Sequence, residues 1–560
     1  SVTSWEIGST LPAGLNFGTS NGTIWGIPTV LQTTASTYTI WANGTHGSVS
    51  ASITLTIYDN APGPFEYNPE NNTWTNNSEV HLAPVFVNQT TGNGSTWQVA
   101  NINSGVSNSN PGYWMEILVG DTLYFSADDG STGHELWAHD FSNHSTWQAA
   151  DIDSGSGNSW PGAYMHLLVG DTIYFSAADG STGEELWAHD TSNHSTWQVA
   201  DIYSGASSSS NPGYYMEILV GDTLYFSAND GSTGYELWAH DTSNHSTWRV
   251  ADINSGNTGS EPGKHMSVLV GDTIYFDAGA TGGRELWAHD ISNHSTWRVV
   301  DIHTGSIGSD PGVGMALLVG DTIYFDADEG STGRELWAHD TSNHSTWRVA
   351  DIQGGSSASS APGQYMSILV GETVYFSAYT TSSGHELWAH DTSNHSTWQV
   401  AEINNWIMMN GMGISSSPGN YMAVPLGDTI YFSAAVEQQG TELWAHDTSN
   451  RSTWKVADID ASIWGSEPGY WMEILVGDTL YFSADDGSTG HELWAHDTSN
   501  HSTWRVADIN SGSGSSDPGN YLEGHLIGDT MYFSANDGST GNELWAHRPF
   551  SIDYNTNTGG

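Results

Sequence analysis

Hydrophobic and polar residues alternate in short runs along most of the chain, and a period of two residues predicts β-strands. From Thr96 onward a unit of roughly 50 residues repeats, which is typical of arrays such as propellers. Each unit holds four runs of five to seven residues, rich in the β-branched and aromatic side chains that favour extended strands. In the first unit these runs are residues 96–102, 115–119, 122–127 and 135–139. The repeats are therefore predicted to be all-β.

We name the strands of one blade, from the inside outward, the first (MEILV), second (TLYFSA), third (ELWAH) and fourth (TWQVA) strand. The third strand occurs nine times, with its tryptophan at Trp137, Trp187, Trp238, Trp287, Trp337, Trp388, Trp444, Trp494 and Trp545. The fourth strand also occurs nine times, from Trp97 to Trp504, so the series begins on a fourth strand and ends on a third. Thr96–Ile102 is therefore predicted to complete the last blade beside Glu543–His547, which removes exposed sheet edges. We predict a nine-bladed β-propeller of four-stranded blades over residues 96–547, closed by the N-terminal strand.

The two faces of the predicted ring differ in how much they vary. The first-to-second turn (Gly120-Asp121, suited to a two-residue hairpin) and the third-to-fourth turn (Ser142–Ser145) share one side, which we call the turn face. The second-to-third and fourth-to-first loops share the other side, the loop face. Copies on the turn face hardly change, whereas the loop face differs from blade to blade, as at Ala278, Ala378 and Ala435. Recognition is therefore predicted on the loop face.

The segments outside the repeats have a different composition. Residues 1–59 are predicted to form a small Ig-like β-sandwich, 60–95 a linker and 548–560 a C-terminal tail. The stretch LPAGLNFGTSNGTIWGIPT, Leu11–Thr29, resembles the Ig-like (cadherin-like) modules found in tandem on prokaryotic surface proteins. Few residues precede this motif, so the module is expected to be incomplete. Either its start is truncated or disordered, or another chain donates a strand.

A second resemblance covers residues 96–547. The stretch ELWAHDTSNHSTWQVADI, followed by VGDTLYFSADDGSTGHELW, resembles the ELWxxDGT repeat of bacterial and archaeal surface proteins, and DTS stands here in place of DGT. The resemblance implies a β-propeller and a surface habitat, but no settled activity.

Composition narrows the set of partners. Lys and Arg total 10 against 63 acidic residues, which argues against nucleic acid and anionic membranes and favours cations or a saline habitat. Without cysteine there is neither a disulfide framework nor a thiol site. No apolar run approaches the ~20 residues of a membrane-spanning helix, so no membrane insertion is expected. Because the chain begins at Ser1 with no signal peptide, we take it as a processed chain or a fragment.

Tryptophan and histidine are abundant, but most occupy fixed repeat positions. The 18 tryptophans of the third and fourth strands are predicted to pack between neighbouring blades. The third-strand histidines, one per blade from His139 to His547, are too far apart to share a metal ion and are predicted to be structural. Tryptophans outside this frame are better candidates for sugar stacking: Trp114, Trp160, Trp406, Trp464 and Trp471.

The third-to-fourth turns carry the N-x-S/T acceptor pattern for glycosylation, although the same residues are also good turn formers. The acceptors are Asn143, Asn193, Asn244, Asn293, Asn343, Asn394, Asn450 and Asn500, with Asn93 in the equivalent place. Five more lie outside the repeats, at Asn21, Asn43, Asn71, Asn76 and Asn88. We expect several of these sites to be glycosylated in an exported protein.

Two sets of polar residues are candidates for cation binding. In the second-to-third loops, the acidic residues either offer oxygen ligands for Ca²⁺, the one cofactor suggested here, or form turns beside Gly. These residues are Asp128, Asp129, Asp179, Asp230, Asp328, Asp485, Asp486 and Asp537. One first-strand position varies in polarity and is predicted to face the central channel, where its residues either hold a cation or are solvated: Glu116, His166, Glu217, Ser267, Ala316, Ser367, Ala423, Glu473 and Glu523.

The longest loop, Ile403–Gly419, has no strand period and contains Trp406, Ile407, Met408, Met409 and Met412. An apolar, Met-rich loop is either a contact surface or a plug for the wide channel. With Trp464 and Trp471, the residues Trp406, Met408, Met409 and Met412 form the predicted binding surface.

No nucleophile–base pair, HExxH motif or phosphate loop is present, and near-identical blades lack the asymmetry of an active site, so no enzyme is expected. The leading hypothesis is an exported, N-glycosylated cell-surface or extracellular adhesion or filament protein of a marine or halophilic archaeon or bacterium. Its partners would be surface glycans, proteins or its own copies, with the Ig-like module and C-terminal tail making contacts between copies. The alternative is a polysaccharide-binding lectin or polysaccharide-active enzyme with its site on the loop face.

Overall fold

A computed structural model describes residues 94–549 except 206–207, 356–357 and 409–411. Before residue 94 it describes 2–8, 10–11, 15–17, 19, 24–26, 32–44, 47–57, 66–68, 73–75 and 87–88. The chain divides into two units. One consists of Trp97–Ile527 and Met531–Ala546, and the other holds Ser1–Thr96 with Gly528–Thr530 and His547–Gly560.

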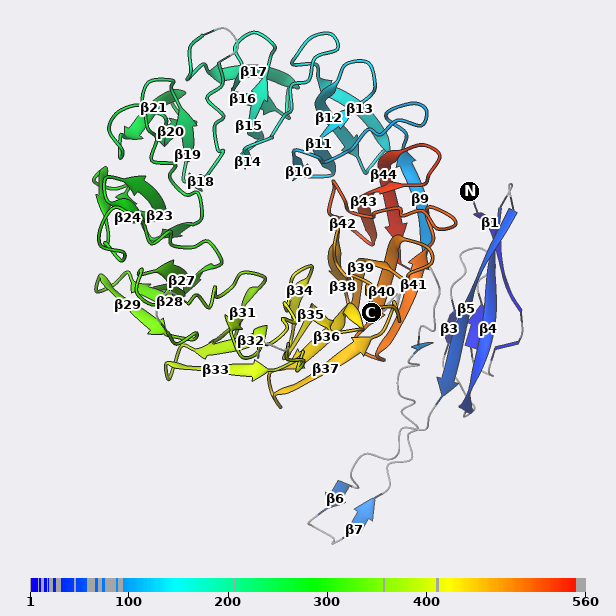
Figure 1. Cartoon of the computed structure of the whole chain (residues 1–560). Coiled ribbons are helices and arrows are strands. Elements are labelled where there is room, and N and C mark those ends of the chain that lie inside the picture. The colour runs from blue at the N-terminus through cyan, green and yellow to red at the C-terminus, as the bar shows by residue number, and fades with distance from the viewer. Residues whose placement is uncertain are drawn as a thin grey trace. The chain divides into compact units, whose positions relative to one another are not determined.

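The larger unit is a ring of nine four-stranded antiparallel sheets, with the first strand of each blade innermost (Figure 1). This confirms the predicted all-β, nine-bladed propeller. The first strands are β10 (Glu116–Val119), β14 (His166–Val169), β18 (Glu217–Val220), β22 (Ser267–Val270), β26 (Ala316–Val319), β30 (Ser367–Val370), β34 (Ala423–Leu426), β38 (Glu473–Val476) and β42 (His525–Ile527). The second strands are β11 (Thr122–Asp128), β15 (Thr172–Ala178), β19 (Thr223–Asn229), β23 (Thr273–Ala280), β27 (Thr322–Asp328), β31 (Thr373–Thr380), β35 (Thr429–Val436), β39 (Thr479–Asp485) and β43 (Thr530–Asn536).

The outer two strands of each blade carry the ELWAH and TW motifs. The third strands are β12 (His134–Asp140), β16 (Glu184–Asp190), β20 (Tyr235–Asp241), β24 (Gly283–Asp290), β28 (Arg334–Asp340), β32 (Gly384–Asp391), β36 (Gly440–Asp447), β40 (His491–Asp497) and β44 (Asn542–Arg548). The fourth strands are β13 (Ser145–Ala150), β17 (Ser195–Ala200), β21 (Ser246–Ala251), β25 (Ser295–Arg298), β29 (Ser345–Ala350), β33 (Ser396–Ala401), β37 (Ser452–Ala457), β41 (Ser502–Ala507) and β9 (Ser95–Ala100).

Strand β9 completes the ninth blade, in the order β42-β43-β44-β9. The Ile102 amide and the Ser109 hydroxyl each donate a hydrogen bond of 2.7 Å to Oε2 of Glu543, across most of the sequence. One hydrophobic cluster joins Phe125 of the first blade, Phe533 of the ninth and Leu493 of the eighth. The ring is thus closed by packing as well as by hydrogen bonds.

Each blade packs against the next through its second and third strands. Phe175 of blade two, for example, is fully buried against Met115 and Leu136 of blade one, with Trp187 at the edge of the same cluster. The first-to-second turn is a two-residue hairpin, since Val119 pairs with Thr122 and Gly120 has φ +59°, as a type II′ turn requires.

The packing prediction for the fourth-strand tryptophans is confirmed for some of them and wrong for others. Trp147, Trp347, Trp398 and Trp504 pack against clusters formed by neighbouring blades. Trp97, Trp197 and Trp248 keep 37–39% of their surface exposed, because the fourth strand is the outermost of its blade.

The smaller unit is described by its own strands. The strands β1 (Val2–Ile7), β4 (Gln32–Gly44), β5 (Gly47–Ile57) and β8 (Val87–Asn88) form one sheet. The pairs β2 (Leu15–Phe17) with β3 (Ile24–Gly26) and β6 (Glu66–Asn68) with β7 (Thr73–Thr75) form two more. In the described part of the chain, no helix has the length and apolar character needed to cross a membrane.

Candidate functional site

A buried glutamate holds each fourth-to-first loop in place. Oε2 of Glu135, on the third strand of blade one, accepts hydrogen bonds from the Ile152 amide at 2.7 Å and the Ser159 hydroxyl at 2.8 Å. Oε1 also accepts the Ser159 amide at 3.1 Å. Equivalent serine-to-glutamate bonds fix the other eight loops, at Glu185, Glu236, Glu285, Glu335, Glu386, Glu442, Glu492 and Glu543. The loop face is therefore built on nine identical anchors.

The sequence pattern does not reveal these anchors, because the glutamate also fits the third-strand motif. In eight blades the serine partner lies at least 24 residues after the glutamate. In the ninth, Ser109 lies more than 400 residues before Glu543. A serine before each X-Pro-Gly, such as Ser159 or Ser260, was the available signal. Burial raises the pKa of Glu135 to about 7, against the opposing effect of its hydrogen bonds.

The fourth-to-first loop between β37 and β38 has a tryptophan at a position where the other eight loops have none. Trp464 lies two residues before the anchor Ser466, where the other loops have Ser, Gly, Thr, Ile or Ala. Its surface is 80% exposed, although Gly465 next to it pairs with Thr441 of β36. Asp460 fixes the start of the same loop by accepting the Ser462 amide and hydroxyl at 2.9 and 2.7 Å. The backbone thus presents the indole to solvent on a fixed support.

Trp464 lines a hollow of 530 Å³ on the loop face of blade eight. Acidic groups surround it: Asp460, Glu467 and Asp485 line the hollow together with His491. Glu467 lies 3.6 Å from Nε2 of His491 and accepts the Tyr421 hydroxyl at 3.2 Å. A flat aromatic side chain beside several oxygen acceptors can bind a ligand that has an apolar face and hydroxyl donors.

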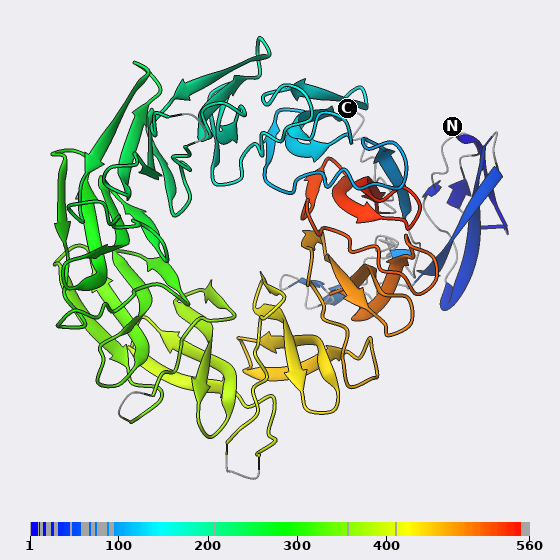
Figure 2. The ribbon, with the colours of Figure 1, turned by 45° about the horizontal axis from the view of Figure 1, so that its top comes forward.

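The other predicted binding residues lie elsewhere. Trp471 does not line this hollow and packs edge-on against Tyr470, with ring centroids 4.4 Å apart. Trp406, Met408 and Met412 belong to a hairpin in which Ile407 pairs with Gly413, and Met409 lies outside the described residues. Trp406, Ile407 and Met408 are 48–62% exposed, and the loop reaches away from the channel in Figure 2. This favours the contact surface over the plug.

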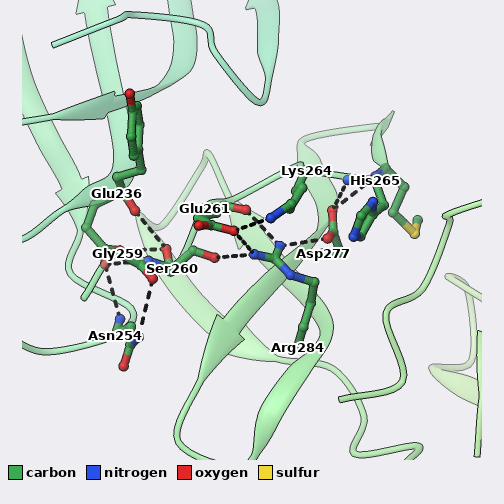
Figure 3. Close-up of polar contacts among 11 residues, drawn as sticks. Glu236, Asn254, Gly259, Ser260, Glu261, Lys264, His265, Asp277 and Arg284 are labelled. Carbon is green, nitrogen blue, oxygen red and sulfur yellow. Dashed lines mark hydrogen bonds and ion pairs between the residues drawn. The ribbon is translucent and has the colours of Figure 1, made fainter. Parts of the chain in front are cut away.

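Blades four and five replace a hydroxyl by a buried ion pair, which Figure 3 shows for blade four. In blade one Ser126 accepts the Trp114 amide, but in blade four Asp277 takes this position, accepts the His265 and Met266 amides, and pairs with Arg284 at 2.7 Å. Asp326 and Arg334 repeat the pair in blade five at 2.7 Å. In Figure 3, Arg284 donates hydrogen bonds to Asp277, to the Ser260 carbonyl and to Glu261. Because the guanidinium is already paired with these groups, it supports the loop and is not available to bind a ligand.

The acidic second-to-third loops use their carboxylates within their own turns. Asp129 accepts the Ser131 and Thr132 amides at 2.8 and 2.7 Å, and Asp179, Asp230, Asp486 and Asp537 do the same in their loops. Asp128, Asp328 and Asp485 each accept the amide of the glycine two residues later. Across the described residues, no three Asp, Glu or His side chains gather to hold a metal ion. The geometry therefore gives the Ca²⁺ hypothesis no support.

First-strand side chains lie at the inner edge of the ring. Glu116 and His525 face each other there at 3.4 Å, and burial raises the pKa of Glu217 to about 7. Glu523 was wrongly placed on the ninth first strand: β42 begins at His525, because one extra residue follows Glu523 in this blade.

The third-strand histidines are structural, as predicted. His139 is fully buried, its Nδ1 lies 2.8 Å from the Thr146 hydroxyl on the fourth strand, and burial lowers its pKa to about 4. The same histidine–threonine bridge occurs in all nine blades.

All eight asparagines predicted as acceptors in the third-to-fourth turns are exposed on the turn face. Asn143 accepts the Ser145 amide and donates to Asp140 at 2.6 Å, which closes the turn around His144 at φ +58°. Outside the ring, Asn43 lies on β4 and Asn88 on β8. Asn21, Asn71, Asn76 and Asn93 lie outside the described residues.

Residues 1–58 match the family described as "Putative Ig domain". No curated protein sequence matches the chain. Among solved structures, the chain is similar to a puromycin hydrolase (TM-score 0.34, 12% identity, covering 69% of this chain and 59% of that one). It is also similar to an oligogalacturonate lyase from Vibrio parahaemolyticus (0.33, 10%, 61% and 90%) and to a tricorn protease (0.24, 12%, 75% and 41%).

The three solved structures named above are enzymes, which runs against the expectation that this protein is not one. Near-identical blades do not exclude an asymmetric site, since one loop, such as that of Trp464, is enough to break the symmetry. At these identities and scores the likeness concerns the fold alone and assigns no activity to this chain.

Proposed function

We propose that the chain is part of an extracellular or cell-surface glycoprotein that binds polysaccharide on the loop face of a propeller built from ELWxxDGT-type repeats. One observation carries the proposal: the exposed Trp464 in a hollow that Asp460, Glu467 and Asp485 also line. The C–H face of a pyranose ring packs against an indole, and its hydroxyls donate to carboxylates.

Charge limits which polysaccharides fit. With a net charge of −53 and carboxylates around the indole, a strongly anionic polymer would be repelled at low salt. A neutral or cationic polysaccharide is therefore the favoured class. The eight exposed turn-face acceptors suit a glycoprotein, and they leave the loop face clear for the ligand.

Replacing Trp464 by Ala is expected to weaken polysaccharide binding about 30-fold, which corresponds to about 2 kcal/mol for an aromatic binding residue. Glycan-array screening followed by titration of the best ligand measures this effect. The matched control is Trp406→Ala, since Trp406 is also an exposed loop-face tryptophan but lies outside the hollow. Equal binding by wild type and Trp464→Ala would refute the proposed site.

The exposed hairpin of Trp406, Ile407 and Met408 favours a second role in adhesion or self-association, because exposed apolar clusters are typical of protein contacts. Filaments or oligomers in electron micrographs of natively isolated protein, lost on changing Ile407 to Ser, would support this role. Monomers alone at high protein concentration would argue against it.

A further inference from the structure

A second hollow lies on the turn face, between blades one and two. It measures 430 Å³, within the ~300–1,000 Å³ of ordinary ligand sites. Blade one lines it with Tyr124, Asp140, Asn143 and Trp147, and blade two with Thr191 and His194. One of the glycosylation acceptors, Asn143, therefore opens into a cavity shared by two blades.

The acceptor side chain is held in a way that leaves room for modification. Asn143 uses its oxygen to accept the Ser145 amide and one hydrogen of Nδ2 for the bond to Asp140. A carboxamide nitrogen carries two hydrogens, so a sugar can replace one while the other keeps the bond to Asp140. The turn does not have to open for a glycan to be attached.

At the interface between blades nine and one, the same space is filled by an aromatic ring. Thr191 donates its amide to Asp171, and Phe141 of blade one makes the equivalent bond to Asp121, so the two residues correspond. The Phe141 ring is 91% buried and lies 4.3 Å from the ring of Tyr532, the counterpart of Tyr124 in blade nine. Between blades nine and one, this space therefore holds a six-membered ring packed on a tyrosine. Between blades one and two, where Thr191 takes the place of Phe141, the space is open.

We propose that the first sugar residues of an Asn143-linked glycan occupy this hollow and bridge blades one and two. A pyranose ring would pack against Trp147 and Tyr124, and its hydroxyls would face Asp140, Thr191 and His194. The inference rests on the glycosylation included in the proposed function. The linking step joins Nδ2 to the anomeric carbon of a lipid-phosphate-linked oligosaccharide, as the anomeric bond to phosphate breaks, the lipid phosphate leaves and Nδ2 loses one proton.

The same residue types recur at other blade interfaces. Between blades two and three they are Asn193, Tyr174, Trp197, Thr242 and His245. Between blades six and seven, Arg451 occupies the position of His194 and its guanidinium lies 5.8 Å from the ring of Trp398. A side chain at this position thus reaches the fourth-strand tryptophan of the preceding blade.

Two substitutions in the glycosylated full chain test whether the Asn143-linked glycan occupies the hollow. Ser145→Ala removes the acceptor pattern, and Thr191→Phe copies Phe141 and fills the hollow while leaving the pattern intact. We expect Ser145→Ala to lower Tm by a few degrees in the otherwise native protein and not at all in the Thr191→Phe background. Glycopeptide mass spectrometry should find Asn143 equally occupied in the native and Thr191→Phe chains.

The possible failures can be told apart. If Asn143 is occupied but Ser145→Ala shifts Tm equally in both backgrounds, the glycan lies outside the hollow and the inference is wrong. If Asn143 carries no sugar, the inference fails as well, and glycosylation at this turn fails with it. Loss of polysaccharide binding through Trp464 would be measured separately, since that residue lies on the other face. Should Thr191→Phe not fold, cryo-electron microscopy of the native glycoprotein decides, because ordered sugar density against Trp147 is expected and density pointing into solvent would overturn the inference.

Discussion

Changing Arg284 to His is expected to destabilise the propeller by about 3–5 kcal/mol, the cost of leaving a buried charge unpaired. Asp277 is fully buried, and its Oδ2 pairs with Arg284 at 2.7 Å. Arg284 also donates to the Glu261 carbonyl at 2.8 Å, so the loop that leads into β22 would lose support as well. Thermal unfolding followed by tryptophan fluorescence measures the loss.

The chain supplies a matched control for this substitution. Blade one has Ser126 and His134 at the two positions, so the double variant Asp277→Ser with Arg284→His rebuilds a native combination. It is expected to recover most of the lost stability, because no buried carboxylate is then left without a cation. A double variant as unstable as the single one would show that the ion pair is not the reason for the loss.

A glutamate anchor and the histidine four residues after it are expected to give opposite pH dependences. Burial raises the pKa of Glu492 from 4.5 to about 7, so between these pH values the folded chain binds a proton that the unfolded chain does not. The stabilisation that this proton supplies is complete below about pH 4.5 and is lost as pH rises to about 7. Burial lowers the pKa of His496 to about 4, so its contribution is lost as pH falls from about 6.5 to 4. At about 1.4 kcal/mol per pKa unit, each amounts to about 3 kcal/mol.

Single substitutions separate the two effects, which oppose each other in the native chain. Relative to wild type, Glu492→Gln should become more stable as pH rises from 4.5 to 7, and His496→Asn should become less stable as pH rises from 4 to 6.5. Urea unfolding at several pH values measures both trends. Parallel trends in the two variants would contradict the assigned protonation states.

The fold was predictable because every repeat shows the same four strand-forming runs, and because the strands on which the array begins and ends are clear from the sequence. A chain that begins at Thr96 on a fourth strand and ends at His547 on a third can satisfy both edges only by closing, and β9 does so. The anchor of Glu135 by Ser159 was not predictable from strand periodicity, because the two residues meet only once the intervening loop folds back.

The candidate site was predictable in part. Trp464 is one of five tryptophans outside the repeat frame, but strand periodicity does not show that it shares a hollow with Asp460 and Glu467 of its own loop and with Asp485 at the end of β39. Glu523 was misplaced because a single inserted residue shifts the register, which alternation alone does not reveal.

A cryo-electron microscopy structure with the best ligand from the glycan array shows whether the loop face around Trp464 binds polysaccharide. We expect sugar density stacked on Trp464, in the hollow that Asp460 and Asp485 also line. Ligand density on the turn face, or in the central channel with the Trp464 hollow empty, would contradict it.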